Sequence, residues 1–95
     1  MLKVENVEIE SKSFEFIHLE MPAAPILILK GKKGFVMCGY LNIDAAEKLG
    51  DFAVRAPGVR DLDTLLDAEV AQCTSISSSA GVETGMKVRE ILRFL

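Results

Sequence analysis

The chain has 95 residues, of which 49% are hydrophobic, and a formal net charge of −3 at pH 7. This length corresponds to one domain, so we expect a single domain over residues 1–95. Its eleven basic residues are scattered except at one turn, which excludes the wide positive field that binding to a nucleic-acid backbone requires.

Two strands are predicted at the start of the chain. Apolar residues alternate over residues 4–9 and over residues 14–21, and the polar residues 11–13 between them predict a turn. The second strand has apolar side chains on both faces, so we expect both faces to be buried along part of it. Pro22 and Pro25 follow, and because proline cannot donate to a strand ladder they indicate a connection.

Two near-continuous apolar runs come next, Ile26 to Lys30 and Phe35 to Leu41. Runs of this kind are typical of central strands, and Gly31 to Gly34 between them predicts a hairpin turn. A chain this short cannot easily cover both faces of such strands. We therefore expect a homo-oligomer that associates through apolar strand or helix surface.

A first helix is predicted after these strands. Asn42 or Asp44 can cap it, and Glu47 stands three residues after Asp44, as in a capping box. Apolar residues at helical spacing extend the prediction to Ala56, and Pro57-Gly58 stops the helix.

The last third of the chain predicts a helix, a strand and a final helix. Asp61 can cap a helix over Leu62 to Ala68, and Val70 to Ser77 reads as a strand. The final helix starts after Thr84 or Gly85, and one apolar stripe marks it: Val88, Ile91, Leu92 and Leu95. The order β-β-β-β-α-α-β-α predicts an α+β domain with a mostly antiparallel or mixed sheet of about five strands and helices packed mainly on one face.

Three segments of the chain form a pattern that is more specific than their composition. They are Ala24-Pro25-Ile26-Leu27, Lys30-Gly31-Lys32-Lys33-Gly34-Phe35-Val36-Met37-Cys38-Gly39-Tyr40-Leu41-Asn42, and Ala45-Ala46-Glu47-Lys48-Leu49-Gly50-Asp51. Together they resemble the YunC-like family of small bacterial and archaeal proteins. The resemblance continues at Gly58-Val59, around Leu65-Leu66 and over Gly81 to Met86, and the chain departs from it at Ser77 to Ala80, where relatives look more strongly helical. It implies little about activity, because the family is a domain of unknown function.

The sequence also bears on location and on cofactors. Its longest apolar run, residues 23–29, is far shorter than the roughly 20 residues that span a bilayer, and residues 1–6 lack an apolar signal core. We therefore expect a cytoplasmic protein with no membrane partner. Two separated cysteines, Cys38 and Cys73, and one histidine do not form a recognisable zinc motif or a disulfide framework, so no metal or cofactor is expected.

Cys38 is the side chain with the clearest chemical potential. A nucleophilic cysteine needs a thiolate, which a helix N-terminus, a cation or a metal must stabilise. The next helix begins about four residues later, roughly 13 Å along an extended strand, so its dipole hardly reaches the sulfur. We expect Cys38 to be a small buried hydrophobe. His18 could serve as its base, or could be a half-buried, hydrogen-bonded histidine with no catalytic role.

Tyr40 and Asn42 are the stronger candidates for a binding site. They stand where a central strand leads into a helix, and such junctions leave a crevice with free backbone N–H groups that can receive a small anionic ligand. The negative charges of Asp44 and Glu47 in the same turn oppose an anion there. The alternatives are a plain helix cap for Asn42 and a half-buried ring for Tyr40.

Two functions are compatible with these residues. The first is a non-enzymatic, self-associating domain that binds a small ligand or a partner protein. The alternative is a small enzyme in which Cys38 works with His18 or Tyr40 in nucleophilic or acid/base chemistry. The enzyme requires the Cys38 sulfur to be open to solvent and within hydrogen-bond reach of a base.

Overall fold

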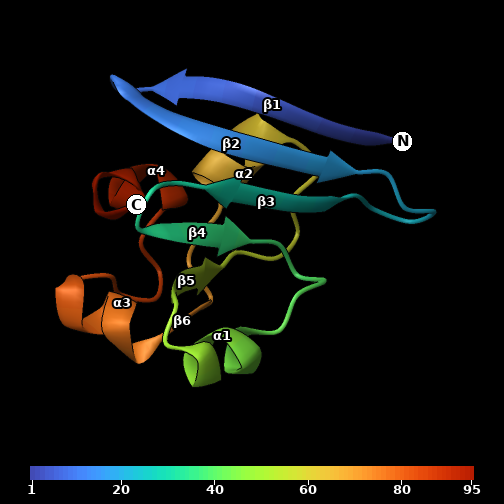
Figure 1. Ribbon diagram of the computed structural model, residues 1–95. Helices are drawn as coiled ribbons and strands as arrows, with labels where there is room; N and C mark the ends of the chain where they lie inside the picture. The colour runs from blue at the N-terminus through green and yellow to red at the C-terminus, as the bar shows by residue number, and fades with distance from the viewer.

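The computed structural model describes residues 1–95 and shows a twisted six-stranded sheet with helices on both faces (Figure 1). The strands, which follow one another across the sheet in chain order, are β1 (Leu2–Ile9), β2 (Lys12–Leu19), β3 (Ile26–Lys30), β4 (Gly34–Met37), β5 (Phe52–Arg55) and β6 (Gln72–Cys73). The helices are α1 (Ile43–Leu49), α2 (Leu62–Asp67), α3 (Ser75–Ala80), α4 (Val88–Ile91) and the 3-10 helix η1 (Leu92–Phe94). The predicted α+β class with a mixed sheet is confirmed. None of the helices combines the length and the apolar composition that crossing a bilayer requires.

The first four strands form an antiparallel meander, as the alternation of apolar residues predicted. The β1–β2 turn places Glu10 and Ser11 in the left-handed region, with φ of 51° and 68°. In the predicted hairpin turn between β3 and β4, the Gly31 N–H donates to the Gly34 carbonyl at 2.8 Å. These local turns fix the register, so each side chain of the meander is assigned to one face of the sheet.

The first helix ends earlier than its apolar spacing predicted. Gly50, with a φ of 79°, forms a left-handed cap whose N–H bonds to the carbonyls of Ala46 and Glu47. The prediction that the helix continues to Ala56 is wrong, because Phe52–Arg55 forms β5, parallel to β4. A short apolar run satisfies both helical and strand patterns, and pairing beside β4 buries its two central residues completely. A Cβ on Gly34 would lie 2.5 Å from the Phe52 carbonyl oxygen, so glycine permits this close approach of the two strands.

The segment after β6 is a helix where the sequence predicted a strand. Only Gln72 and Cys73 pair with β5, and Ser75–Ala80 forms α3. Its capping partner comes from α1, because Glu47 accepts hydrogen bonds from the backbone N–H of Ser75 at 2.7 Å and from its hydroxyl at 2.5 Å. Glu47 is therefore not in a capping box with Asp44. This cap from a distant residue cannot be read from the local sequence.

The contact between α1 and α3 predicts a pH-dependent contribution to stability. Hydrogen bonds from the Ser75 hydroxyl and then the Ser75 N–H lower the pKa of Glu47 below its ordinary value of 4.5. A lowered carboxyl pKa stabilises the fold above the ordinary pKa, and this contribution is lost as the pH falls through the folded-state pKa. We expect Glu47→Gln to lower the melting temperature at pH 7, with the difference from wild type fading as the pH falls below 4.5.

The control for this prediction is Glu83→Gln, which removes an exposed carboxylate that takes part in no hydrogen bond or ion pair within the chain. Melting curves from about pH 3 to about pH 8, followed by circular dichroism, compare each variant with wild type on both sides of the ordinary glutamate pKa. A difference for Glu47→Gln that stays constant across this range would contradict the account.

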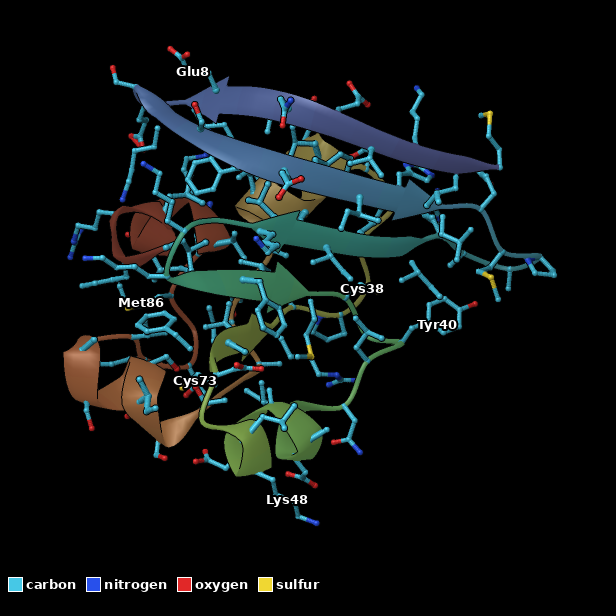
Figure 2. All side chains as sticks on the ribbon, in the orientation of Figure 1. Glu8, Cys38, Tyr40, Lys48, Cys73 and Met86 are labelled. Carbon is cyan, nitrogen blue, oxygen red and sulfur yellow. The ribbon has the colours of Figure 1, made fainter.

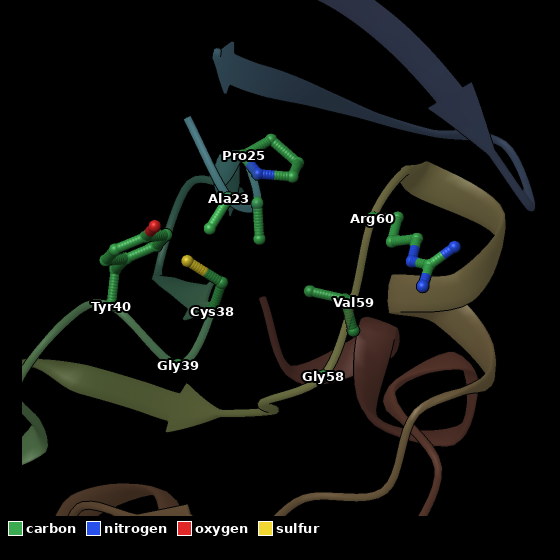
Figure 3. Close-up of a pocket in the computed structure, with 9 residues that line it drawn as sticks. Ala23, Pro25, Cys38, Gly39, Tyr40, Gly58, Val59 and Arg60 are labelled. Atoms are coloured by element: carbon green, nitrogen blue, oxygen red, sulfur yellow. The ribbon is translucent and has the colours of Figure 1, made fainter. Parts of the chain in front are cut away.

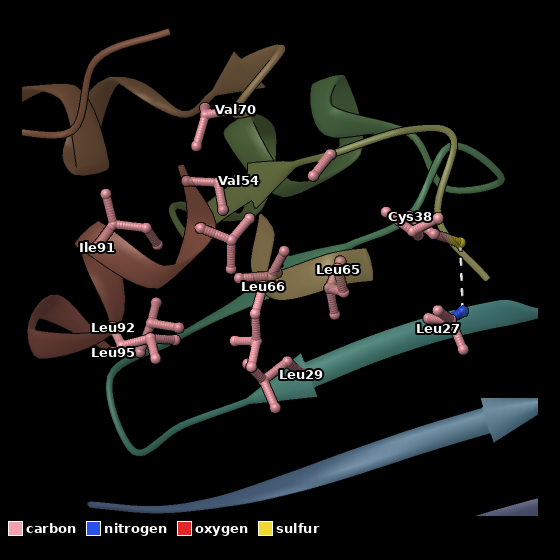
Figure 4. Close-up of a cluster of buried hydrophobic side chains, with 14 of the residues drawn as sticks. Leu27, Leu29, Cys38, Val54, Leu65, Leu66, Val70, Ile91, Leu92 and Leu95 are labelled. Atoms are coloured by element: carbon pink, nitrogen blue, oxygen red, sulfur yellow. Dashed lines mark hydrogen bonds between the residues drawn. The ribbon is translucent and has the colours of Figure 1, made fainter. Parts of the chain in front are cut away.

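The sheet divides the core into two clusters. On the inner face, 17 buried residues pack between the sheet and α2, α4 and η1 (Figure 4), and they include the predicted stripe of the last helix. On the outer face, α1 covers a smaller cluster: Met37, Ile43, Ala46 and Ala53. Helices therefore lie on both faces, with the larger share on the inner face, and α3 lies at the sheet edge beside β5.

Candidate functional site

The two parallel strands, β4 and β5, form a switch point in the topology. β4 leads to α1 on the outer face, whereas β5 leads through residues 56–61 to α2 on the inner face. Because the two connections leave on opposite sides, the chain opens a crevice outside the carboxyl ends of these strands. Open α/β sheets bind ligands at such points.

A pocket of about 430 Å³ lies at this point (Figure 3). Three segments line it: residues 23–25 before β3, residues 38–40 after β4 and residues 58–60 after β5. We call it the switch-point pocket. Its walls mix apolar and polar surface, with Arg60 at one end, beyond Val59, and Tyr40 at the other. Its volume lies within the range of small-molecule sites.

Arg55 holds the wall of the pocket that follows β4. Its guanidinium donates to the Leu41 carbonyl at 3.2 Å, to the Gly39 carbonyl at 3.0 Å and to Gln72 Oε1 at 3.1 Å. These bonds join the loop after β4 to β5 and to β6. Arg55 therefore positions the backbone beside Tyr40, a role that sequence reasoning missed because it assigned Arg55 to a helix.

Arg60 lies at the rim of the pocket, and its guanidinium extends away from Cys38 and Tyr40, beside α2 (Figure 3). Its backbone N–H donates to Thr64 Oγ1 at 2.9 Å, which fixes the residue just before α2, while its guanidinium makes no hydrogen bond or ion pair within the chain. The next residue, Asp61, caps α2, as predicted. The backbone N–H of Thr64 and then its hydroxyl hold the pKa of Asp61 below its ordinary value, so Asp61 is a carboxylate committed to the cap.

Cys38 is buried, with 2% of its surface exposed. Its sulfur accepts a hydrogen bond from the Leu27 N–H at 3.3 Å (Figure 4) and points toward Ala23 on the floor of the switch-point pocket (Figure 3). No side-chain base lies within hydrogen-bond reach of it. The arrangement required of a cysteine nucleophile is therefore missing.

His18 and Cys38 lie on opposite sides of strand β3. His18 on β2 pairs with Leu27, and Cys38, just after β4, bonds to Leu27 from the other side. Two strand spacings, roughly 10 Å, separate their backbones. The His18 ring shares a hydrogen bond of 3.1 Å with Glu20 and meets the Phe16 ring edge-on. The structure thus brings Tyr40, but not His18, to the pocket that Cys38 lines.

The predicted pair Tyr40 and Asn42 is divided between two hollows. Tyr40 is 49% exposed and lines the switch-point pocket, and it also borders a smaller hollow of about 280 Å³ that Asn42 lines. Asn42 Oδ1 accepts a hydrogen bond from the Asp44 N–H at 2.7 Å, so Asn42 caps α1. The Asp44 carboxylate also borders the smaller hollow, while Arg55 there is already bonded. The smaller hollow therefore has an acidic residue at its border and no cation that is free of hydrogen bonds.

Other polar clusters are less organised. Cys38 and Cys73 are free thiols on separate parts of the sheet (Figure 2), and no three His, Cys, Asp or Glu side chains come together in a way that could hold a metal ion. A hollow of about 450 Å³ lined by Lys12, Lys32 and Lys33 lies at the opposite end of β3. Lys12 Nζ there donates to the Arg93 carbonyl at 2.9 Å, and all three lysines are exposed.

Comparisons with known proteins place the chain among its relatives. The family model of a domain of unknown function, DUF1805, matches residues 37–95, which include two of the three segments of the switch-point pocket. The chain is 30% identical to the uncharacterized protein YunC of Bacillus subtilis, over 97% of this chain and 95% of that protein. It is also similar to the crystal structure of a protein of unknown function, TA1206 from Thermoplasma acidophilum, with a TM-score of 0.96 and 37% identity over 100% of this chain and 93% of that one. The chain therefore belongs to the DUF1805 family of YunC-like proteins, as its residues indicated.

Proposed function

We propose that this chain is a small-ligand-binding domain and that the switch-point pocket is its binding site. The observation that carries the proposal is the position of the pocket, at the carboxyl ends of two parallel strands whose connections diverge to opposite faces. Segments from three separate parts of the chain converge there. Such convergence on rigid strand ends is typical of binding sites.

The lining residues define the class of ligand. The guanidinium of Arg60 at the rim, which makes no hydrogen bond or ion pair within the chain, favours a carboxylate or phosphate that reaches this end of the pocket, because it can bind either with two parallel hydrogen bonds. The Tyr40 ring, Pro25 and Val59 favour an apolar or planar body. We therefore infer that the ligand is a small organic anion. The sequence analysis also predicted an anionic ligand.

The geometry favours binding over nucleophilic catalysis. The Cys38 sulfur receives a backbone N–H and contacts no base, and His18 is held by Glu20 on another part of the sheet. Cys38 is therefore assigned to the pocket floor, where its small size leaves room for the ligand.

The test starts with a thermal-shift screen of small carboxylates and phosphates, because a ligand selective for the native state raises its melting temperature. For any compound that does so, we expect Arg60→Gln to weaken binding by about tenfold or more, since a charge-assisted hydrogen bond contributes about 1.5–3 kcal/mol. Lys48→Gln is the control, because it removes one exposed positive charge from α1, outside the pocket.

Tyr40→Ala is expected to weaken binding of the same compound, whereas Asn42→Ala is expected to leave the affinity unchanged and only to lower stability, as the loss of a helix cap does. Isothermal calorimetry measures the affinity, and circular dichroism verifies the fold of each variant. Equal affinities for Arg60→Gln, Tyr40→Ala and wild type would overturn the proposal.

A further inference from the structure

Strand β1 presents a long, free edge of the sheet. It has eight residues and pairs with β2 alone, whereas the other edge strand, β6, has two residues and is followed directly by α3. Leu2 and Val4 on β1 are 61% and 57% exposed. An edge of this length and composition is a template for pairing with another strand.

The hydrogen bonds of β1 determine which of its residues can pair outward. The Glu20 N–H donates to the Met1 carbonyl at 2.9 Å, so Met1 and Glu20 form a hydrogen-bonded pair at the start of the β1–β2 ladder. Such pairs alternate in an antiparallel ladder, so Lys3, Glu5 and Val7 also bond to β2. Leu2, Val4 and Asn6 consequently direct their backbone N–H and C=O groups toward the free edge.

A second copy of the same strand fits this edge in a register that brings opposite charges together. In this register two antiparallel β1 strands meet with Val4 opposite Val4 on a two-fold axis. Leu2 of each copy then lies opposite Asn6 of the other, and Lys3 of each copy lies opposite Glu5 of the other, which gives two opposite-charge pairs. Shifting the register by two residues in either direction instead places Glu5 opposite Glu5 or Lys3 opposite Lys3. Lys3 and Glu5 are both exposed and make no ion pair within the chain, so both charges are available.

We propose that two copies of this chain form a dimer by antiparallel pairing of their β1 strands in this register, which extends the sheet across the two-fold axis. The outward backbone groups of Leu2, Val4 and Asn6 bond to those of the second copy. The outer apolar side chains of the two β1 strands meet at Val4. This interface lies on β1, away from the switch-point pocket, so the dimer and the ligand site are tested separately.

Charge reversal tests the register. Lys3→Glu and Glu5→Lys each place like charges opposite one another twice, whereas the double variant K3E/E5K restores two opposite-charge pairs. In sedimentation equilibrium at low ionic strength, we expect each single variant to raise the dimer Kd by about tenfold or more and the double variant to return it to near the wild-type value. Glu8→Lys is the matched control, because Glu8 lies on the same strand but outside the paired residues 2–6.

A backbone variant provides a second test. The Val4 N–H points to the free edge and is not used within the chain, so Val4→Pro is expected to preserve the fold, verified by circular dichroism, while abolishing the dimer. A wild-type chain that remains monomeric at all concentrations would overturn the proposal. So would a dimer that none of these variants weakens, because it would use another surface, such as the outer face of the sheet.

Discussion

Leu65→Ala is expected to lower the free energy of unfolding by about 2–5 kcal/mol, the cost of a large-to-small substitution in a packed core. Leu65 is fully buried on α2 within the inner cluster (Figure 4), so its loss leaves a cavity between the helix and the sheet. Domains of this size have a total stability of about 5–15 kcal/mol. The substitution therefore removes a large part of it, and a melting temperature lower by about 10 °C or more follows.

The matched control is Leu49→Ala, the same change in another helix at a side chain that is 78% exposed. It is expected to change the free energy of unfolding by less than about 0.5 kcal/mol. Urea denaturation of both variants, followed by circular dichroism, measures the two changes. Similar costs for Leu65→Ala and Leu49→Ala would contradict the inner cluster as the main core.

Arg55→Met is expected to destabilise the chain by about 1.5–3 kcal/mol and to weaken ligand binding as well. Methionine retains an unbranched stem of similar length but removes the donors that hold the Leu41 and Gly39 carbonyls and Gln72. The loop after β4 then loses its attachment to β5, and Tyr40 loses its fixed position beside the pocket.

Arg89→Met serves as the comparison. Arg89 makes an ion pair with Asp67 on the exposed surface, at 3.0 Å, and an exposed pair contributes about 0–1 kcal/mol. Urea denaturation gives the stability of each variant, and calorimetry with a compound from the screen gives its affinity. An Arg55→Met variant as stable as Arg89→Met, with wild-type affinity, would show that the guanidinium does not position the loop.

The elements that the sequence predicted well are those whose signals are local. The hairpin at Gly31 to Gly34, the Asp61 cap and the stripe from Val88 to Leu95 each depend on residues within a few positions of one another. The sequence motif from Met37 to Asn42 also indicated the family to which the chain belongs. Local chemistry was sufficient in these places because turns, caps and amphipathic stripes are satisfied within the segment itself.

The elements that the sequence analysis missed depend on partners that are distant in the sequence. Phe52–Arg55 is a strand because β4 is free to pair with it, and α3 begins where Glu47 of another helix caps Ser75. For the same reason, the sequence analysis placed the candidate site at the junction of Tyr40 and Asn42 and not at the switch-point pocket. Tyr40 was recognised at the end of β4, but Arg60 was not, because Pro57-Gly58 was interpreted as the stop of a helix and not as the loop after a parallel strand.

The most direct test of the switch-point pocket is an NMR titration of the ¹⁵N-labelled chain with a compound that the carboxylate and phosphate screen identifies. If the pocket is the binding site, the largest amide shifts will come from its three segments, residues 23–24, 38–40 and 58–60, and they will disappear in Arg60→Gln. Shifts confined to Asn42 and Asp44, or to Lys12, Lys32 and Lys33, would place the ligand in another hollow and contradict the assignment.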